Sequence, residues 1–214
     1  MNATPARPPR DSGFTLVELV GVLAVIAVLS AMLVPQVLGI MSRSRVLDTV
    51  GSYVSIKAGA ITYAAKHGLI GDAAGAALDV GTSPPEALNW DAEVLFKLRL
   101  IDGVFRSRIS TSASVRVRAT EPSGTAPDGS NAAYNLLGAA MPANQVSGAK
   151  HVVEVHLTQV QLDDAREINR HLDGTSAELG ESATGTDLRG RVKYDFSANP
   201  VPGMGDVYLY VTHL

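Results

Sequence analysis

The chain has 214 residues, of which 46% are hydrophobic, a formal net charge of −3 and no cysteine. This length fits one membrane segment and one globular domain of ordinary size. The mildly acidic balance argues against bulk binding of nucleic acid, and the lack of cysteine excludes disulfides, thiolate zinc sites and thiol catalysis.

The first 42 residues combine a short basic segment with a long uncharged one. Arg7 and Arg10 precede residues 19–42, which contain no Asp, Glu, Lys or Arg. A helix needs about 20 apolar residues to cross the hydrocarbon core of a bilayer, so this run is long enough to span. The basic residues before it predict a cytoplasmic amino terminus and a translocated body. A secretory signal would have a shorter apolar region with its cleavage site behind it.

Glu18 is a single carboxylate at the start of this apolar run. A charge at the centre of a bilayer costs roughly 2.5–3.5 kcal/mol, which predicts a partner for it. One interpretation is an amine: if the chain is cut after Gly13, the new amino group of Phe14 lies four residues before Glu18 on the same helix face. The other is a position at the membrane interface, where a carboxylate near a helix start suits the helix dipole.

The segment Gly13-Phe14-Thr15-Leu16-Val17-Glu18-Leu19, behind its basic leader, resembles the processing site of type IV prepilins and of type II secretion pseudopilins. The resemblance implies cleavage after Gly13, N-methylation of Phe14 by the same prepilin peptidase, and a contact between Glu18 and the amino terminus of a neighbouring subunit. Pro35 also matches a proline common in this part of pilin helices. The partners implied are further copies and related pilins in a filament, the peptidase, an inner-membrane assembly platform, and membrane lipid before assembly.

The helix that begins at Phe14 is predicted to continue to His67, where Gly68 can adopt the left-handed cap conformation. Pro35 inside the apolar run removes a backbone hydrogen bond and tends to kink or break a helix. Beyond that run, apolar residues recur every three or four positions, which indicates an amphipathic helix. These residues are Val46, Val50, Tyr53, Val54, Ile61 and Ala64.

The rest of the chain alternates strand-like and helical segments. Strands are predicted at 114–119, 152–157, 191–196 and 207–212, where β-branched or aromatic residues recur. A short helix is expected after Asn89 or Trp90, with Trp90 as a core anchor, and another over 162–172, where Asp164 and Glu167 suit a capping box. An antiparallel sheet with one face on the amphipathic helix accounts for this order.

The predicted fold is therefore α+β and, by resemblance, pilin-like: a long amino-terminal helix packed on a small antiparallel sheet. Four parts follow from this organisation. They are a cleaved leader (1–13), a transmembrane and assembly helix (14–42), its amphipathic continuation (43–67) and a globular head (68–214).

Four carboxylates fall in a loop rich in Gly, Ser and Thr, namely Asp173, Glu178, Glu181 and Asp187. Calcium prefers six to eight oxygen ligands, so this loop could fold around the ion, although the spacing is not that of an EF-hand. A solvated acidic loop without a cofactor is the preferred interpretation, and calcium is the alternative. The resemblance is what supports the alternative, because major pseudopilins tend to lack the disulfide of many pilins and to use this ion.

Arg106, Arg108, Arg116 and Arg118 form the only basic cluster outside the leader. They could contact DNA or acidic neighbours, but the interleaved aromatic residues of single-strand binders are missing. The outward face of a strand is the preferred interpretation.

No motif of the H-E-x-x-H, G-x-S-x-G or phosphate-loop type indicates a catalytic centre. We therefore expect a non-catalytic filament subunit, anchored once in the bacterial inner membrane with its head in the periplasm, which later joins a surface pilus or a periplasmic pseudopilus. A pseudopilin of a type II secretion system is the alternative. A membrane-tethered periplasmic enzyme or binding domain is a remoter one.

Overall fold

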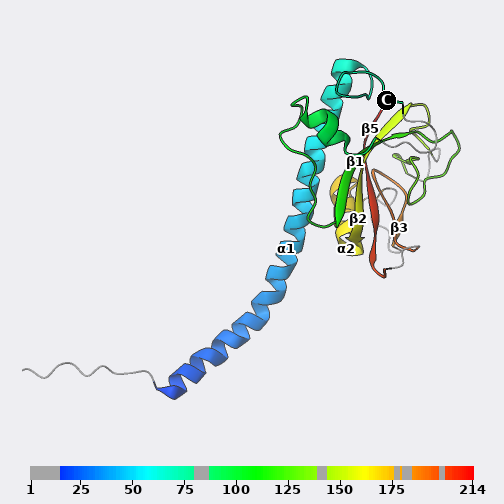
Figure 1. The fold of residues 1–214 in the computed structure, drawn as a ribbon. Helices are drawn as coiled ribbons and strands as arrows, with labels where there is room; N and C mark the ends of the chain where they lie inside the picture. The colour runs from blue at the N-terminus through cyan, green and yellow to red at the C-terminus, as the bar shows by residue number, and fades with distance from the viewer. Residues whose placement is uncertain (1–14, 80–86, 139–143, 176–178, 180–184, 198–200) are drawn as a thin grey trace, which may run out of the picture. The chain divides into compact units, whose positions relative to one another are not determined.

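A computed structural model describes residues 15–79, 87–138, 144–175, 179, 185–197 and 201–214. The elements in chain order are α1 (Leu16–His67), η1 (Asp91–Phe96), β1 (Ser112–Ala119), β2 (His151–Gln161), α2 (Leu162–Leu172), β3 (Thr186–Asp187), β4 (Val192–Asp195) and β5 (Met204–His213) (Figure 1). By its internal contacts the chain divides into a unit of residues 1–41 and a unit of residues 42–214. The helix α1 runs through both.

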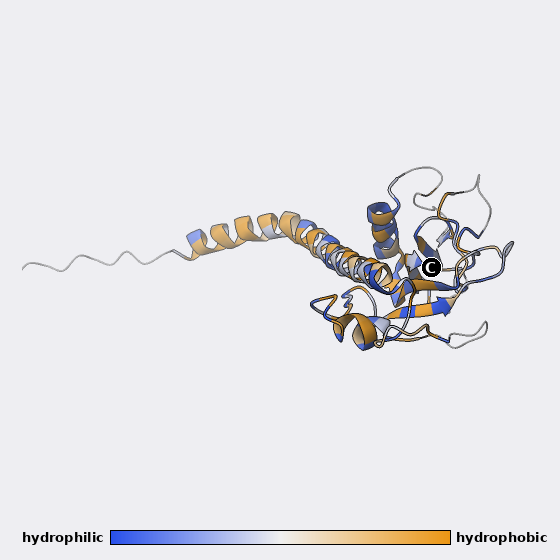
Figure 2. Ribbon diagram, turned by 90° about the horizontal axis from the view of Figure 1, so that it is seen from above, coloured by the Kyte–Doolittle hydropathy of each residue, from blue (hydrophilic) through white to orange (hydrophobic). Residues whose placement is uncertain are grey.

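The long amino-terminal helix is confirmed. It continues through Pro35 without ending there, and it stops at His67 because Gly68 takes a φ of +70° and donates its N–H to the Ala64 carbonyl at 2.7 Å. The part of α1 in the first unit is almost uniformly hydrophobic (Figure 2) and its side chains are exposed. In the described residues α1 is the one helix long and apolar enough to cross a membrane.

The sheet is antiparallel throughout, with strand order β1-β2-β5-β4-β3. The four predicted strands are present. Strands β1, β2 and β5 extend beyond their predicted ends, whereas β4 is shorter than predicted at both ends. The two-residue strand β3 was not predicted, because a segment this short leaves no alternation to recognise. The predicted α+β class is confirmed.

Both helices cover one face of the sheet. Val46 and Tyr53 of α1, Ile168 of α2, and Val153 and Leu209 of the sheet belong to one core. Because side chains alternate along a strand, every second residue of β5 and of β2 as far as Leu157 faces this core, and a register shift in β2 then places Val160 in it. The Tyr53 hydroxyl crosses it and donates to the backbone carbonyl of Tyr210 at 2.5 Å.

Of the apolar residues predicted to form one face of the amphipathic part of α1, two do not lie on the buried face. Val54 and Ile61 are 56% and 49% exposed, because beyond the membrane run α1 has two apolar faces and the sheet packs against the other one. That buried face includes the small residues Gly59 and Ala60. A Cβ atom on Gly59 would lie 2.6 Å from the Ile101 side chain, so the chain after η1 approaches α1 closely there.

The short helix predicted after Asn89 or Trp90 is present as a π-helix, η1, which is followed by a turn. Trp90, just before it, is buried, and its indole N–H donates to the Gly71 carbonyl at 2.7 Å. Its ring meets Tyr63 of α1 edge to face. The predicted role of Trp90 as a core anchor is confirmed.

The helix α2 has the predicted bounds, but the predicted capping box is wrong. Gln161 is the N-cap and makes no side-chain cap hydrogen bond. The helix follows β2 directly, so Asp164 already lies inside its first turn. There its carboxylate accepts a hydrogen bond from the Ser42 hydroxyl of α1 at 3.0 Å.

Candidate functional site

The start of α1 is built by Thr15 and Glu18. The Thr15 backbone N–H and hydroxyl donate to Glu18 Oε2 at 2.9 and 2.8 Å, and the Glu18 N–H donates back to Thr15 Oγ1 at 3.3 Å. This is a reciprocal capping box, which satisfies two N–H groups that a helix start leaves free. The sequence signal for it, Thr-x-x-Glu, was present but was not used in predicting the helix start.

Glu18 keeps one acceptor atom for another donor. Both side-chain hydrogen bonds end on Oε2, and no described residue donates to Oε1. Gly13 and Phe14 lie outside the described residues, so the cleavage site itself has no structural description here. The capping box orients the carboxylate at the helix start, where the amino group of a processed chain would begin.

A second candidate surface lies on the part of α1 within the unit of residues 42–214, which is called the head from here on. Leu47, Val54 and Ile61 are about half exposed and recur every seven residues. A repeat of seven places side chains along one side of a helix. This stripe, which we call the outer stripe, leaves apolar surface of the head uncovered on the side of α1 away from the sheet.

In the acidic loop, the structure describes Asp173 and Asp187, whereas Glu178 and Glu181 lie outside the described residues. The Asp173 carboxylate accepts backbone N–H groups of Arg191 and Val192 at 2.8–2.9 Å. Burial raises the pKa of Asp173 to about 6, against these hydrogen bonds, and the nearby charge of Asp187 adds to the rise.

Asp187 is 2% exposed and accepts the Asn169 side-chain N–H at 2.8 Å and the Arg189 backbone N–H at 3.1 Å. The side-chain oxygen atom of Asn169, Oδ1, is buried without a hydrogen-bond partner. Within the described ranges no group of three or more His, Asp or Glu side chains is arranged to hold a metal ion. Asp173 and Asp187 thus act as acceptors for the protein's own N–H groups, and each retains lone pairs for a cation.

The sheet face opposite the helices holds a buried polar network. The Lys193 ammonium is completely buried and donates to the Asn131 carbonyl at 2.7 Å, the Asn131 side chain at 3.3 Å and the Ala133 carbonyl at 2.9 Å. It also lies 4.2 Å from the centre of the Tyr134 ring. The Tyr134 hydroxyl donates to the buried carboxylate of Glu154 at 2.5 Å.

This network explains how the long segment after β1 is held on the sheet. Burial lowers the pKa of Lys193 to about 8, opposed by the charges of Glu154 and Asp128, and burial together with Glu154 raises the pKa of Tyr134 well above its usual value. Groups with shifted pKa values often mark catalytic sites. Here they are enclosed and bonded to one another, so their arrangement serves packing.

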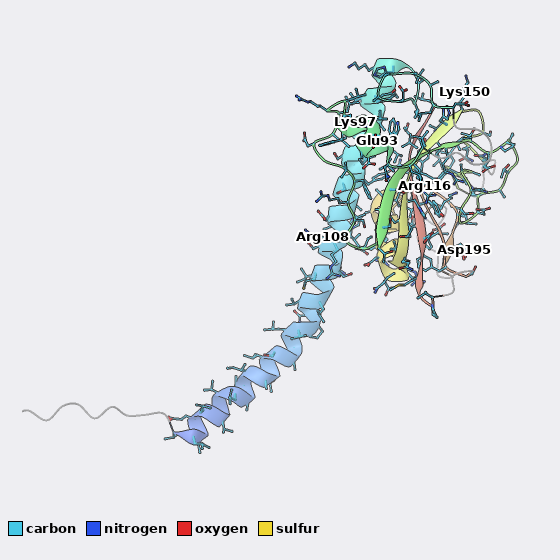
Figure 3. All side chains as sticks on the ribbon, in the orientation of Figure 1. Glu93, Lys97, Arg108, Arg116, Lys150 and Asp195 are labelled. Atoms are coloured by element: carbon cyan, nitrogen blue, oxygen red, sulfur yellow. The ribbon has the colours of Figure 1, made fainter. Side chains whose placement is uncertain are left out.

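The arginine cluster predicted from the sequence divides into two sites. Arg116 and Arg118 lie on the outward face of β1, as predicted. Arg118 pairs with Glu154 at 3.3 Å, and the Arg116 guanidinium lies 5.9 Å from the centre of the Tyr208 ring. Figure 3 shows Arg116 beside β1. Arg106 and Arg108 precede the strand, so their placement on a strand face was wrong. They line a hollow beside α1.

Comparison with known proteins identifies the amino-terminal segment. Residues 8–34 match the family model of the prokaryotic N-terminal methylation motif, which is the signature of type IV pilins and pseudopilins. The matched residues include Gly13, Phe14 and Glu18. No curated protein and no solved structure matches the chain. The chain therefore combines the pilin and pseudopilin signature with the corresponding layout, a long amino-terminal helix followed by a small antiparallel sheet.

Proposed function

We propose that the chain is a non-catalytic structural subunit of a type IV pilus-like filament. Prepilin peptidase cuts it between Gly13 and Phe14 and methylates the new amino group, and the subunit then assembles through α1. The observation that carries this proposal is the match of residues 8–34 to the methylation motif, because cleavage and methylation at this motif precede assembly in pilins and pseudopilins.

The geometry of the helix start supports a role for Glu18 in assembly. Its Oε1 atom accepts no hydrogen bond from the residues that the structure describes, while Thr15 holds Oε2. A carboxylate in an apolar surrounding is stabilised by a cationic partner. The methylated amino terminus of a neighbouring subunit supplies that cation, and docking would neutralise both groups.

The exposed apolar surface of α1 supports the same role. The membrane-length part of the helix is exposed along its whole length, and the outer stripe of Leu47, Val54 and Ile61 extends the apolar surface into the head. Exposed apolar surface of this extent is typical of interaction sites. In the anchored subunit lipid covers the first part, and in the filament neighbouring helices replace the lipid.

The proposal implies four partners for the subunit: the peptidase, an inner-membrane assembly platform, further copies of the chain and related pilins. The subunit begins as a single-pass protein of the inner membrane with its amino terminus in the cytoplasm and its head in the periplasm. The proposed destination is a surface pilus, and a periplasmic pseudopilus of type II secretion is the alternative. The total lack of cysteine supports the alternative, since many pilins close their carboxyl-terminal region with a disulfide.

Intact-mass analysis of the chain produced with and without an active prepilin peptidase tests the processing step. The proposal predicts a product that begins at Phe14 and carries one added methyl group, formed only with the peptidase. Gly13→Ile serves as the cleavage-site variant and Gly21→Ile as its control, because no atom lies within 4 Å of a Cβ placed on Gly21. An unprocessed chain in the presence of the peptidase would refute the proposal.

A further inference from the structure

Beside α1 the head carries a polar hollow of about 560 Å³. Asp48 and Ser52 of α1 form one wall, and residues 104–108 and 110–113, which lead into β1 and include its first two residues, form the other. The filament role proposed above does not use this hollow.

The hollow holds more positive than negative charge. Arg106 makes no hydrogen bond or ion pair with any residue that the structure describes. Arg108 faces Asp48 at 3.6 Å, with side chains that are 77% and 55% exposed, and exposed pairs of this kind are weak. The hollow therefore contains two guanidinium groups but one carboxylate, which pairs with Arg108 only. Figure 3 shows Arg108 directed away from the sheet beside α1.

Hydroxyl groups complete the lining. Ser110 contributes an oxygen atom that is buried and has no hydrogen-bond partner, and Ser52, Thr111 and Ser112 add further hydroxyls. Guanidinium groups with hydroxyl donors match the geometry and charge of a phosphate group. The lining thus suits an oxyanion.

The position of the hollow along α1 indicates which oxyanion reaches it. The uncharged run ends at Ser42, and Arg43 and Arg45 follow. Asp48 lies six residues after Ser42, about 9 Å further along the helix at 1.5 Å per residue. The headgroup layer on each side of a bilayer is roughly 5–8 Å thick. In the anchored subunit, therefore, the hollow lies within reach of the headgroups for an arginine side chain.

We propose that this hollow binds the phosphate of an anionic phospholipid in the outer leaflet of the membrane that anchors the subunit. Arg106 and Arg108 hold the phosphate, and Ser110 donates its hydroxyl to it. The interaction rests on the proposed membrane-anchored state and would hold the head against the bilayer until assembly extracts the helix. A headgroup is favoured over an acidic side chain of a neighbour because Arg43 and Arg45, the first basic residues after the apolar run, precede Asp48 by only five and three residues along α1.

The test uses the processed full-length chain in nanodiscs that contain equal parts of phosphatidylglycerol and phosphatidylethanolamine. Native mass spectrometry after release reports which lipid stays bound. Phosphatidylglycerol should be enriched on the wild type. Arg106→Gln/Arg108→Gln should weaken its binding about 30-fold, because two basic residues near an anionic membrane surface together strengthen binding by about this factor. Arg106→Lys/Arg108→Lys should retain most of the enrichment. Lys66→Gln/Arg99→Gln removes the same charge from exposed positions elsewhere in the head and should change nothing.

Each outcome decides one point. Equal loss in both glutamine variants, or none in either, would overturn the lipid site. Displacement of the lipid by inorganic phosphate at similar concentration would show a site for free phosphate instead. Normal lipid retention with impaired filament formation in Arg106→Gln/Arg108→Gln would show that the hollow takes a carboxylate of a neighbour. A chain that does not enter the nanodisc at all would contradict the membrane anchor, and with it the proposed function.

Discussion

Thr15 and Glu18 cap the start of α1 reciprocally: the threonine donates twice to one carboxylate oxygen, and its hydroxyl accepts the Glu18 N–H. The carboxylate that the family resemblance assigns to assembly is therefore also part of the helix start. If Glu18 meets a neighbouring subunit as proposed, its orientation is set beforehand by the cap, and Oε1 is the atom that accepts the new donor. Preorganisation of this kind lowers the entropy lost on docking.

Replacing the threonine tests this dual role. Thr15→Val removes the hydroxyl and should destabilise the first helical turn by about 1 kcal/mol, the usual contribution of an N-cap. Hydrogen exchange at residues 15–19 in detergent micelles should become faster, and filament yield should fall. Thr15→Ser keeps the hydroxyl and should behave like the wild type. Unchanged exchange in Thr15→Val would show that the cap does not order the helix start.

The buried carboxyl group of Asp173 predicts a dependence of head stability on pH. Its folded-state pKa of about 6 lies above the ordinary value of 3.8, so the folded head binds a proton more tightly than the unfolded chain. Ionisation of Asp173 between about pH 4 and pH 6 therefore reduces stability, by roughly 3 kcal/mol at 1.36 kcal/mol per pKa unit.

Urea unfolding of a fragment of residues 42–214, which contains the whole core of the head, measures this effect. In chelator, the free energy of unfolding of the wild type relative to Asp173→Asn should fall as pH rises from 4 to 7. The asparagine can still accept a hydrogen bond from Arg191 but does not ionise. A difference that stays constant over this range would contradict the burial of an ionising Asp173.

Calcium remains a prediction for the loop of Asp173, Glu178, Glu181 and Asp187. The convergence of Asp173 and Asp187 and the unpaired Asn169 Oδ1 fit oxygen ligation. A bound ion would stabilise the head by about 2.7 kcal/mol at a hundredfold excess over Kd. Thermal unfolding of the same fragment in calcium, in magnesium and in chelator should then give a higher Tm in calcium alone. Glu178→Gln/Glu181→Gln should abolish the shift, and equal Tm values would leave a solvated loop.

Lys193 is predicted to hold the segment after β1 on the sheet. Lys193→Met removes the donor for the Asn131 and Ala133 carbonyls and should destabilise the head by about 2 kcal/mol, near 1 kcal/mol for each lost hydrogen bond. Hydrogen exchange should accelerate at residues 131–134. Lys150→Met, at an exposed lysine, is the matched control. Equal stability of the two variants would mean that the buried ammonium contributes nothing net.

The sequence predicted most of the elements because their signals are local. Gly68 ends α1, the apolar spacing defines α2, and alternation defines the main strands. Which face of α1 is buried could not be predicted, since both Val54 and Ile56 lie on apolar faces and only the sheet decides between them. The separation of Arg106 from Arg116 could not be predicted either, because it depends on where β1 begins. The Thr15 cap had a clear local signal in Thr-x-x-Glu.

The most direct measurement of the assembly mechanism is the yield of sheared filaments from cells that carry Glu18→Val, Glu18→Asp or the wild type, with membrane fractions analysed in parallel. Glu18→Val should insert into the membrane at wild-type levels, because an apolar residue enters the bilayer more easily, yet give few filaments because the amino group of the neighbour has no partner. Glu18→Asp should give an intermediate yield. Filaments at wild-type levels from Glu18→Val would contradict assembly through Glu18.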